Sequence, residues 1–166
     1  VATKVIDDAK TGRIMEYKPQ DLSICVWAFA TSGIENKSLF DAVATKVIDD
    51  AKTGKINKYI PQDLSNCVWA FATAGVENKS FFDAVATKVI KDAKTRKINK
   101  YVPQDLSNYV WAFATSGIEN TSLFDAVAAK VFDDTKTGEI NKYAPQALAN
   151  CVWAFATSGI ENKSLF

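Results

Sequence analysis

The chain repeats itself every 42 residues, and this period constrains its fold more than any other feature of the sequence. Equivalent phenylalanines occur at Phe40, Phe82, Phe124 and Phe166. The stretches 40–81 and 82–123 are identical at 34 of their 42 positions. A period of about 20–50 residues is typical of stacked repeats, which form solenoids or propellers. Because the apolar residues recur at helical spacing and do not alternate, we expect helices and not propeller strands.

Each unit carries the signals for a first helix that begins at a proline and ends at a glycine. Pro61 suits the first helical position, and Asp63 follows where a negative charge favours the helix dipole. Gly75 predicts a left-handed cap at the carboxyl end. The apolar residues expected to face the core are Leu64, Cys67, Val68, Phe71 and Ala72. The same signals recur at Pro19, Pro103, Pro145, Gly33, Gly117 and Gly159.

A second helix follows in each unit. The pattern Ser-x-x-Asp, as in Ser38 and Asp41, predicts a capping box at its start. Its expected core-facing stripe is Phe40, Val43, Ala44, Val47, Ile48 and Ala51. Gly54 ends this helix, whereas the next unit has Arg96 at the same position. A left-handed arginine costs about 1 kcal/mol relative to glycine, so we expect that turn to be the weakest or to have a different shape.

These signals together predict an all-α fold, a right-handed α-solenoid of tandem 42-residue helix-turn-helix repeats. We expect one array over 1–166, because a single helix pair cannot bury both of its faces. Residues 1–17 hold the second helix of a truncated unit, 18–59, 60–101 and 102–143 are full units, and 144–166 are a truncated unit. The incomplete end units are expected to fray and to self-associate through apolar faces.

Composition and residue types exclude several functions. The net charge of +1 gives no bulk basicity or acidity, and no apolar run reaches the roughly 18 residues of a membrane span. Cys25, Cys67 and Cys151 occupy equivalent positions, about 8–10 Å apart on neighbouring helices and too far for disulfides. We interpret them as small apolar fillers in a reducing compartment. With no histidine and no paired-cysteine spacing, we expect no metal, no cofactor, no small-molecule substrate and no enzyme activity.

The segments PQDLSNCVWAFATAG and PQDLSNYVWAFATSG, followed by FFDAVA and LFDAVA, resemble octotricopeptide-type repeats of organellar RNA-binding proteins. They are also similar to repeats of the FAST-kinase-like and RNA-editing substrate-binding complex proteins, whose members often end in a RAP domain. The resemblance implies RNA binding in mitochondria or plastids, for processing, stability, editing or translation of transcripts. The unit is a few residues longer than the usual octotricopeptide repeat, with the excess in the KTGKINKY connector, and the sequence holds no RAP domain.

One polar stripe of the first helix is the candidate base-reading surface. Amide side chains offer donors and acceptors together, which suits base edges. The candidate base-facing residues are Gln62, Asn66, Thr73, Gln104, Asn108, Thr115, Gln146, Asn150 and Thr157. A small alanine, such as Ala70, lies in the stripe and would allow close approach. The alternative is an ordinary solvated helix face.

Tryptophans and lysines flank the polar stripe. The equivalent residues Trp27, Trp69, Trp111 and Trp153 lie at its border, where we favour core or inter-unit packing over base stacking. Connector lysines form a candidate phosphate-facing ridge, or ordinary solubilising charge. The ridge residues are Lys55, Lys58, Lys97, Lys100 and Lys142, with Asp49 and Asp50 diluting their charge.

The leading functional hypothesis is therefore a helical-repeat segment that binds single-stranded RNA along one face. The alternative is a protein-protein interaction scaffold, because helical solenoids also present extended surfaces to peptides. Near-neutral charge favours the scaffold, and the family resemblance favours RNA.

Overall fold

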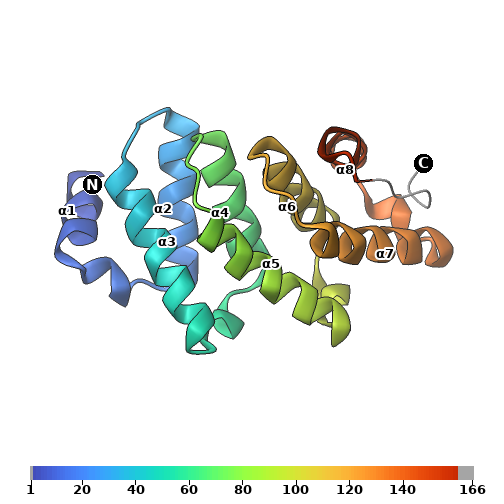
Figure 1. The fold of residues 1–166 in the computed structure, drawn as a ribbon, viewed down its shortest axis with the longest axis horizontal. Helices are drawn as coiled ribbons and strands as arrows, with labels where there is room; N and C mark the ends of the chain where they lie inside the picture. The colour runs from blue at the N-terminus through green and yellow to red at the C-terminus, as the bar shows by residue number, and fades with distance from the viewer. Residues whose placement is uncertain (1, 161–166) are drawn as a thin grey trace.

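The computed structural model describes residues 2–160, and every regular element in this range is helical (Figure 1). The α-helices are α1 (Ala2–Thr11), α2 (Pro19–Ser32), α3 (Lys37–Lys52), α4 (Pro61–Thr73), α5 (Lys79–Lys94), α6 (Pro103–Thr115), α7 (Thr121–Thr137) and α8 (Pro145–Ser158). Short 3-10 helices form the connectors: η1 (Arg13–Glu16), η2 (Lys55–Lys58), η3 (Lys97–Lys100) and η4 (Glu139–Lys142). The expected all-α fold is confirmed, and the part of the last unit at 161–166 lies outside the described residues.

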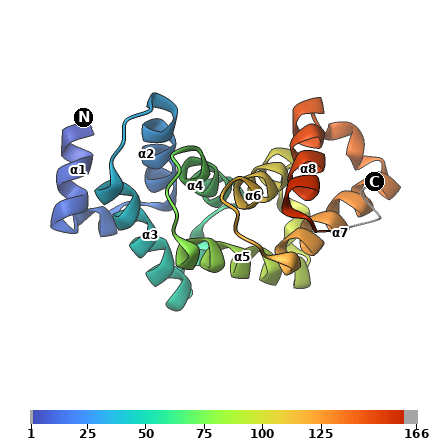
Figure 2. The same ribbon diagram turned by 45° about the horizontal axis from the view of Figure 1, so that its top comes forward.

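The helices pack neighbour to neighbour in two layers. In one layer α2, α4, α6 and α8 lie side by side, and in the other α1, α3, α5 and α7 do so. Figure 2 shows a crescent, with the α2/α4/α6/α8 layer on its hollow side and the other layer outside. We call these the inner and outer layers. Inner-layer helices contact each other more extensively than outer-layer helices do, which is consistent with the curvature.

The inner-layer helices begin and end where the sequence predicts. Each starts at its proline, and the Asp63 carboxylate accepts a hydrogen bond from the Ile60 amide at 3.1 Å, which satisfies a free N–H at the helix start. Gly75 adopts a left-handed conformation with φ of 65° just beyond α4. The proline and glycine signals therefore set both ends of these helices.

The predicted start of the outer-layer helices is wrong. Asn36, not Ser38, caps α3, because its side-chain oxygen accepts a hydrogen bond from the Leu39 amide at 2.9 Å. Asn78 and Asn120 cap α5 and α7 in the same way. These helices therefore start earlier than the Ser-x-x-Asp pattern indicates. Asp41 lies within the helix and pairs with Lys37 at 2.7 Å instead of closing a capping box.

Arg96 has a φ of 60°, the left-handed conformation expected from its place in the repeat. The expectation of a different turn shape is wrong, because η3 follows Arg96 just as η2 follows Gly54. The arginine is therefore held in a backbone conformation that favours glycine, and this strain lowers the stability of the folded state. Whether this turn is the weakest stays a prediction.

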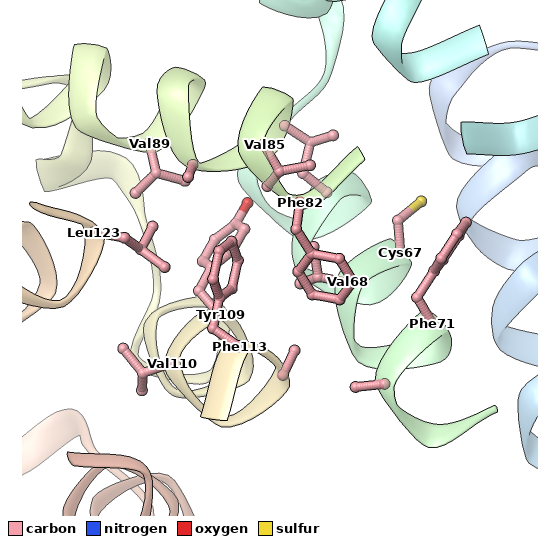
Figure 3. Packing of buried hydrophobic residues seen from close by; sticks show 14 of the residues in the cluster. Cys67, Val68, Phe71, Phe82, Val85, Val89, Tyr109, Val110, Phe113 and Leu123 are labelled. Atoms are coloured by element: carbon pink, nitrogen blue, oxygen red, sulfur yellow. The ribbon is translucent and has the colours of Figure 1, made fainter. Parts of the chain in front are cut away.

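The core is a chain of aromatic contacts that links the two layers. Phe40 of α3 packs edge-to-face on Phe71 of α4, with ring centroids 5.0 Å apart. The pair Phe82–Phe113 repeats this geometry at 5.0 Å, and Phe124–Phe155 at 4.9 Å. Figure 3 shows how Phe113 and its neighbour Tyr109 lie beneath α5. Each contact joins the second helix of one unit to the first helix of the next, so the core continues through the array.

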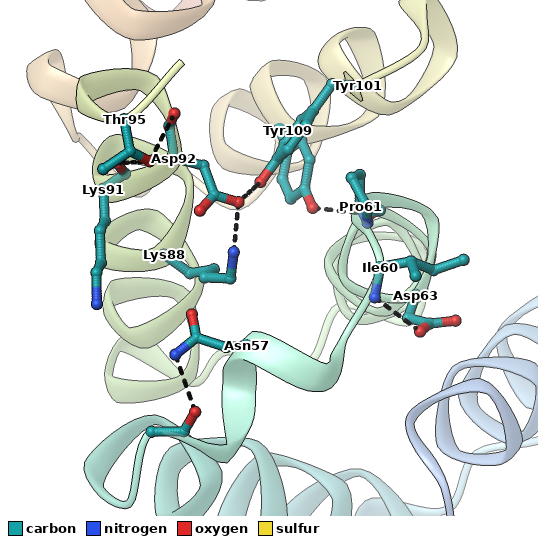
Figure 4. A network of polar contacts seen from close by, with 11 residues as sticks. Asn57, Ile60, Pro61, Asp63, Lys88, Lys91, Asp92, Thr95, Tyr101 and Tyr109 are labelled. Atoms are coloured by element: carbon teal, nitrogen blue, oxygen red, sulfur yellow. Dashed lines mark hydrogen bonds and ion pairs between the residues drawn. The ribbon is translucent and has the colours of Figure 1, made fainter. Parts of the chain in front are cut away.

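Tyr109 takes the position that a cysteine has in the other units. Its ring is fully buried, and its hydroxyl donates a 2.8 Å hydrogen bond to the Pro61 carbonyl oxygen of the preceding unit (Figure 4). The tyrosine therefore adds a polar link between α4 and α6.

A buried Lys–Asp–Tyr cluster holds each 3-10 connector against its outer-layer helix. In α5, Lys88 pairs with Asp92, and the Tyr101 hydroxyl donates to the same carboxylate at 2.9 Å (Figure 4). The clusters Lys46–Asp50–Tyr59 and Lys130–Asp134–Tyr143 repeat the arrangement. Asp50 therefore does not dilute a surface ridge, as the sequence suggested. It is buried because its lysine and tyrosine partners satisfy the carboxylate.

Candidate functional site

A cavity of about 590 Å³ opens on the inner layer and receives side chains from all four of its helices. We call it the inner groove. Its lining combines side-chain amides with tryptophan rings and one lysine. The lining residues are Trp27, Thr31, Asn66, Trp69, Val102, Pro103, Gln104, Ser107, Asn108, Lys142, Ala144, Gln146, Ala147 and Asn150.

Five of the nine candidate base-facing residues meet in the inner groove. They are Asn66, Gln104, Asn108, Gln146 and Asn150, and they come from three successive inner-layer helices. The three asparagines are half-buried and the two glutamines are exposed. Amides held partly out of water present their donors and acceptors in fixed directions, which is what selective hydrogen bonding needs. Gln62 is exposed but does not line the groove.

The threonine positions lie elsewhere. Thr73, Thr115 and Thr157 are exposed near the carboxyl ends of their helices. Thr73 lines a separate cavity of about 530 Å³ beside the turns between the two helices of a unit. In α4, α6 and α8 the polar stripe is therefore divided along the helix, and only its first half reaches the inner groove. In α2 the equivalent threonine, Thr31, does line the groove.

The alanine of the predicted stripe does not allow a ligand to approach. Ala70, Ala112 and Ala154 are fully buried. The inner-layer helices pack closely, and a small side chain at their contact is what permits such packing. The helical-wheel interpretation of this position is wrong because the wheel contains no neighbouring helix.

The tryptophans pack between units and also border the inner groove. Trp69 and Trp111 stack with ring centroids 6.3 Å apart and an interplanar angle of 26°. Trp27 and Trp153, at the two ends of the inner layer, are each 46% exposed. Inter-unit packing therefore accounts for the middle pair. Trp27 and Trp69 nevertheless offer ring surface within the groove.

Of the candidate phosphate-facing lysines, Lys142 alone lines the inner groove. It pairs with Glu139 within η4. Lys55 and Lys58 line another cavity, of about 280 Å³, together with Tyr17 of the preceding unit and Pro19 of their own unit. Lys97 and Lys100 are exposed. The lysines are thus on the connectors, as expected, but they do not form one ridge beside the amides.

Two buried carboxylates, Asp63 and Asp105, lie in the first turns of α4 and α6. The Ser65 hydroxyl donates a 2.9 Å hydrogen bond to Asp105 across the unit boundary. Burial raises the pKa of Asp105, and the Ser65 hydrogen bond partly opposes that shift. Burial likewise raises the pKa of Asp63. The sequence marked these aspartates as helix-start residues but gave no sign of the link between units.

Cys67 and Cys151 are buried and Cys25 is half-buried, and burial leaves these thiols poorly suited to chemistry. Burial raises the pKa of Cys151 to about 12 and that of Cys67 still further. A thiol must ionise to act as a nucleophile, so these groups are unreactive at neutral pH. The three cysteines are free, as predicted from their spacing.

The chain matches no known family model and no curated protein. Within residues 2–160, no group of three or more histidine, cysteine, aspartate or glutamate side chains is arranged to hold a metal ion. None of the described helices is long and apolar enough to cross a membrane.

Proposed function

We propose that the array is a right-handed α-solenoid that binds single-stranded RNA in its inner groove, as part of a mitochondrial or plastid RNA-processing, stability or editing factor. The observation that carries the proposal is the meeting of five side-chain amides from three units in one groove. The organellar setting rests on the resemblance to octotricopeptide-type repeats alone. No catalytic role is part of the proposal.

The chemistry of the groove suits unpaired bases. Its amides match the donor and acceptor pattern of base edges, and the exposed surface of Trp27 and Trp69 offers a platform on which a base can stack. Lys142 supplies a positive charge beside the amides for a phosphate. An extended strand could therefore cross the inner-layer helices and meet one unit after another.

The repeated amides also predict what kind of RNA binds best. Asn66, Asn108 and Asn150 occupy equivalent positions, so three neighbouring units should prefer the same base. The expected target is a short run of one base, and a strict mixed-sequence site across these units would contradict the proposal.

The decisive experiment titrates fluorescently labelled homopolymeric RNA with the protein and follows anisotropy at two salt concentrations. We expect binding that favours one base and weakens with salt. Alanine substitution of all three groove asparagines, N66A/N108A/N150A, should weaken binding by at least about 100-fold if each amide contributes roughly 1 kcal/mol.

The matched control is the triple variant T73A/T115A/T157A, which changes the polar positions outside the inner groove. It should bind RNA like the wild-type protein. Equal losses in both triple variants would show that the groove does not read bases. A folded protein that binds no homopolymer would favour the alternative, a protein-protein interaction scaffold.

A further inference from the structure

Lysines surround the cavity that lies between the start of α2, the last turns of α3 and the connector η2. Its volume of about 280 Å³ is close to the roughly 300 Å³ at which small-molecule sites begin. Four of its lining residues are lysines and one is acidic. The lining residues are Tyr17, Lys18, Pro19, Lys46, Asp50, Lys55, Lys58 and Tyr59. We call it the lysine cavity.

The one carboxylate in this lining is already neutralised. Asp50 pairs with Lys46 at 2.6 Å and accepts a hydrogen bond from the Tyr59 hydroxyl at 2.9 Å. The other three lysines of the lining have no ion-pair partner among residues 2–160. They are Lys18, Lys55 and Lys58. The lysine cavity therefore has three positive charges that no carboxylate offsets.

Acidic residues next to the cavity are engaged elsewhere. Asp21 accepts a hydrogen bond from the Lys18 backbone amide at 3.1 Å, and Asp49 pairs with Lys52 at 3.7 Å. Ammonium groups gathered around one cavity repel each other, and an anion bound between them would replace this repulsion with attraction.

The other unit boundaries lack this set of charges. The equivalents of Lys18 are Ile60 and Val102, which are 55% and 53% exposed, so exposure at this position is not an effect of the chain end. At the position of Lys55, the last unit has Glu139, which pairs with the lysine at the end of η4. The three uncompensated lysines therefore meet only at the boundary between the first two full units.

The open space is also particular to this boundary. At the next boundary Tyr109 lies between the equivalents of a proline and a tyrosine that line the lysine cavity. Its hydroxyl donates to the Pro61 carbonyl oxygen at 2.8 Å, and its ring centroid is 5.9 Å from that of Tyr101 (Figure 4). The residue equivalent to Tyr109 at the lysine cavity is Cys67, whose shorter side chain leaves this space open.

We propose that the lysine cavity binds the phosphate group of a phosphomonoester. Such a group carries about −1.5 to −2 charges at neutral pH and has three acceptor oxygens, which suits three lysines. A phosphodiester carries a single charge and would gain less from the same site. Lysine binds phosphate as a flexible point charge, so exposed lysines can close around the group. The site is separate from the inner groove and does not depend on RNA binding there.

The phosphomonoester can belong to a free nucleotide or to the 5′ end of an RNA strand. At the last boundary, the equivalents of Lys18 and Pro19 are Val102 and Pro103, and both line the inner groove. The lysine cavity therefore opens on the same side of the array as the inner groove. Both sources present the same chemistry to the three lysines.

Isothermal titration calorimetry with uridine 5′-monophosphate at low salt tests the proposal, with uridine as the control that lacks the phosphate. We expect one saturable site per chain for the monophosphate, weakened by added salt, and no binding of uridine. K18I and K55E introduce the residues that other units carry at these positions, so the fold should be retained. Each should weaken binding about tenfold or more.

The matched control is K52I, which removes a lysine that is exposed outside the cavity. It should bind the monophosphate like the wild-type protein. The double variant I60K/Y109C gives the next boundary a third lysine and a small side chain, so it should bind two monophosphates per chain. Circular dichroism checks that each variant is folded.

A second titration identifies the source of the phosphate. If oligouridylate with a 5′-phosphate binds more tightly than the same RNA with a 5′-hydroxyl, and K18I removes the difference, the cavity holds an RNA end. If the two RNAs bind equally while the monophosphate still binds, the cavity holds a free phosphomonoester. N66A/N108A/N150A should leave monophosphate binding unchanged, which separates this site from the inner groove.

Three results would overturn the proposal. One is a folded wild-type protein that shows no saturable binding of the monophosphate up to about 10 mM at low salt. Another is a loss of binding in K52I as large as that in K18I, since the charge would then act without the cavity. The third is a folded I60K/Y109C variant that still binds a single monophosphate.

Discussion

Breaking the buried ion pair of α5 should destabilise the protein far more than breaking an exposed pair on the same helix. In the Lys88–Asp92 pair, both side chains are 7% exposed. The substitution K88M keeps the aliphatic stem and leaves the Asp92 carboxylate charged and buried. Removing one partner of a buried pair costs about 3–5 kcal/mol. Because the Tyr101 hydroxyl still donates to Asp92, we expect the lower value, about 3 kcal/mol.

The chain supplies a matched control in Lys79–Asp83. This pair lies on the same helix with the same four-residue spacing, but its side chains are 76% and 46% exposed. Exposed pairs of this kind contribute about 0.3–0.5 kcal/mol, so K79M should change the free energy of unfolding by no more than that. Urea titration followed by circular dichroism measures both variants, and the slope of each transition shows whether the unfolding unit has changed.

A double variant separates the charge from the packing. K88M/D92N removes the buried charge and keeps an oxygen that can accept the Tyr101 hydrogen bond. This double variant should regain most of the stability that K88M loses, so its free energy of unfolding should lie within about 1 kcal/mol of the wild-type value. The reasoning fails if K88M costs no more than K79M, or if the double variant is less stable than K88M.

Two further predictions concern individual positions. R96G should stabilise the protein by about 1 kcal/mol, because glycine has no strain at the φ of 60° found there, and an unchanged urea midpoint would count against backbone strain. Burial raises the pKa of Asp105 above its ordinary value of 3.8, so ionisation is disfavoured in the folded state and stability falls as pH rises through the folded pKa. The free energy of unfolding of D105N, measured relative to that of the wild-type protein, should therefore be higher at neutral pH than below pH 3.8. Unfolding free energies of the two proteins that change in parallel with pH would contradict this.

The helices were predictable because their signals are local. Proline at the start of an inner-layer helix and glycine after it act through the backbone of the same few residues, and the structure retains both. The outer-layer start was missed because Asn36 and Ser38 are both good capping residues two positions apart, and the Ser-x-x-Asp spacing favoured the wrong one.

The features that the sequence did not reveal are those that depend on contacts with neighbouring helices. The Lys88–Asp92–Tyr101 cluster was missed, although a lysine and an aspartate four residues apart, with a tyrosine nine residues further on, recur in every unit. Charged residues at that spacing usually lie on solvated surfaces, so the pattern alone gives no sign of burial. The burial of Ala70 likewise follows from the approach of adjacent helices, which a single helix does not encode.

The geometry of the inner layer narrows how a unit could read RNA. Gln62 and Asn66 lie one turn apart in the first half of α4, Ala70 is buried, and Thr73 lies about 10 Å beyond Asn66 along the axis. A strand that crosses the helices along the inner groove would therefore meet at most two amides per unit, and a threonine of the stripe only in the first unit, where Thr31 lines the groove. The first unit has Ile24 at the asparagine position, so it retains one amide at most. Base preference should accordingly be shared by the three later units and weak in the first, and replacing Ile24 with asparagine should lengthen the preferred run by one base.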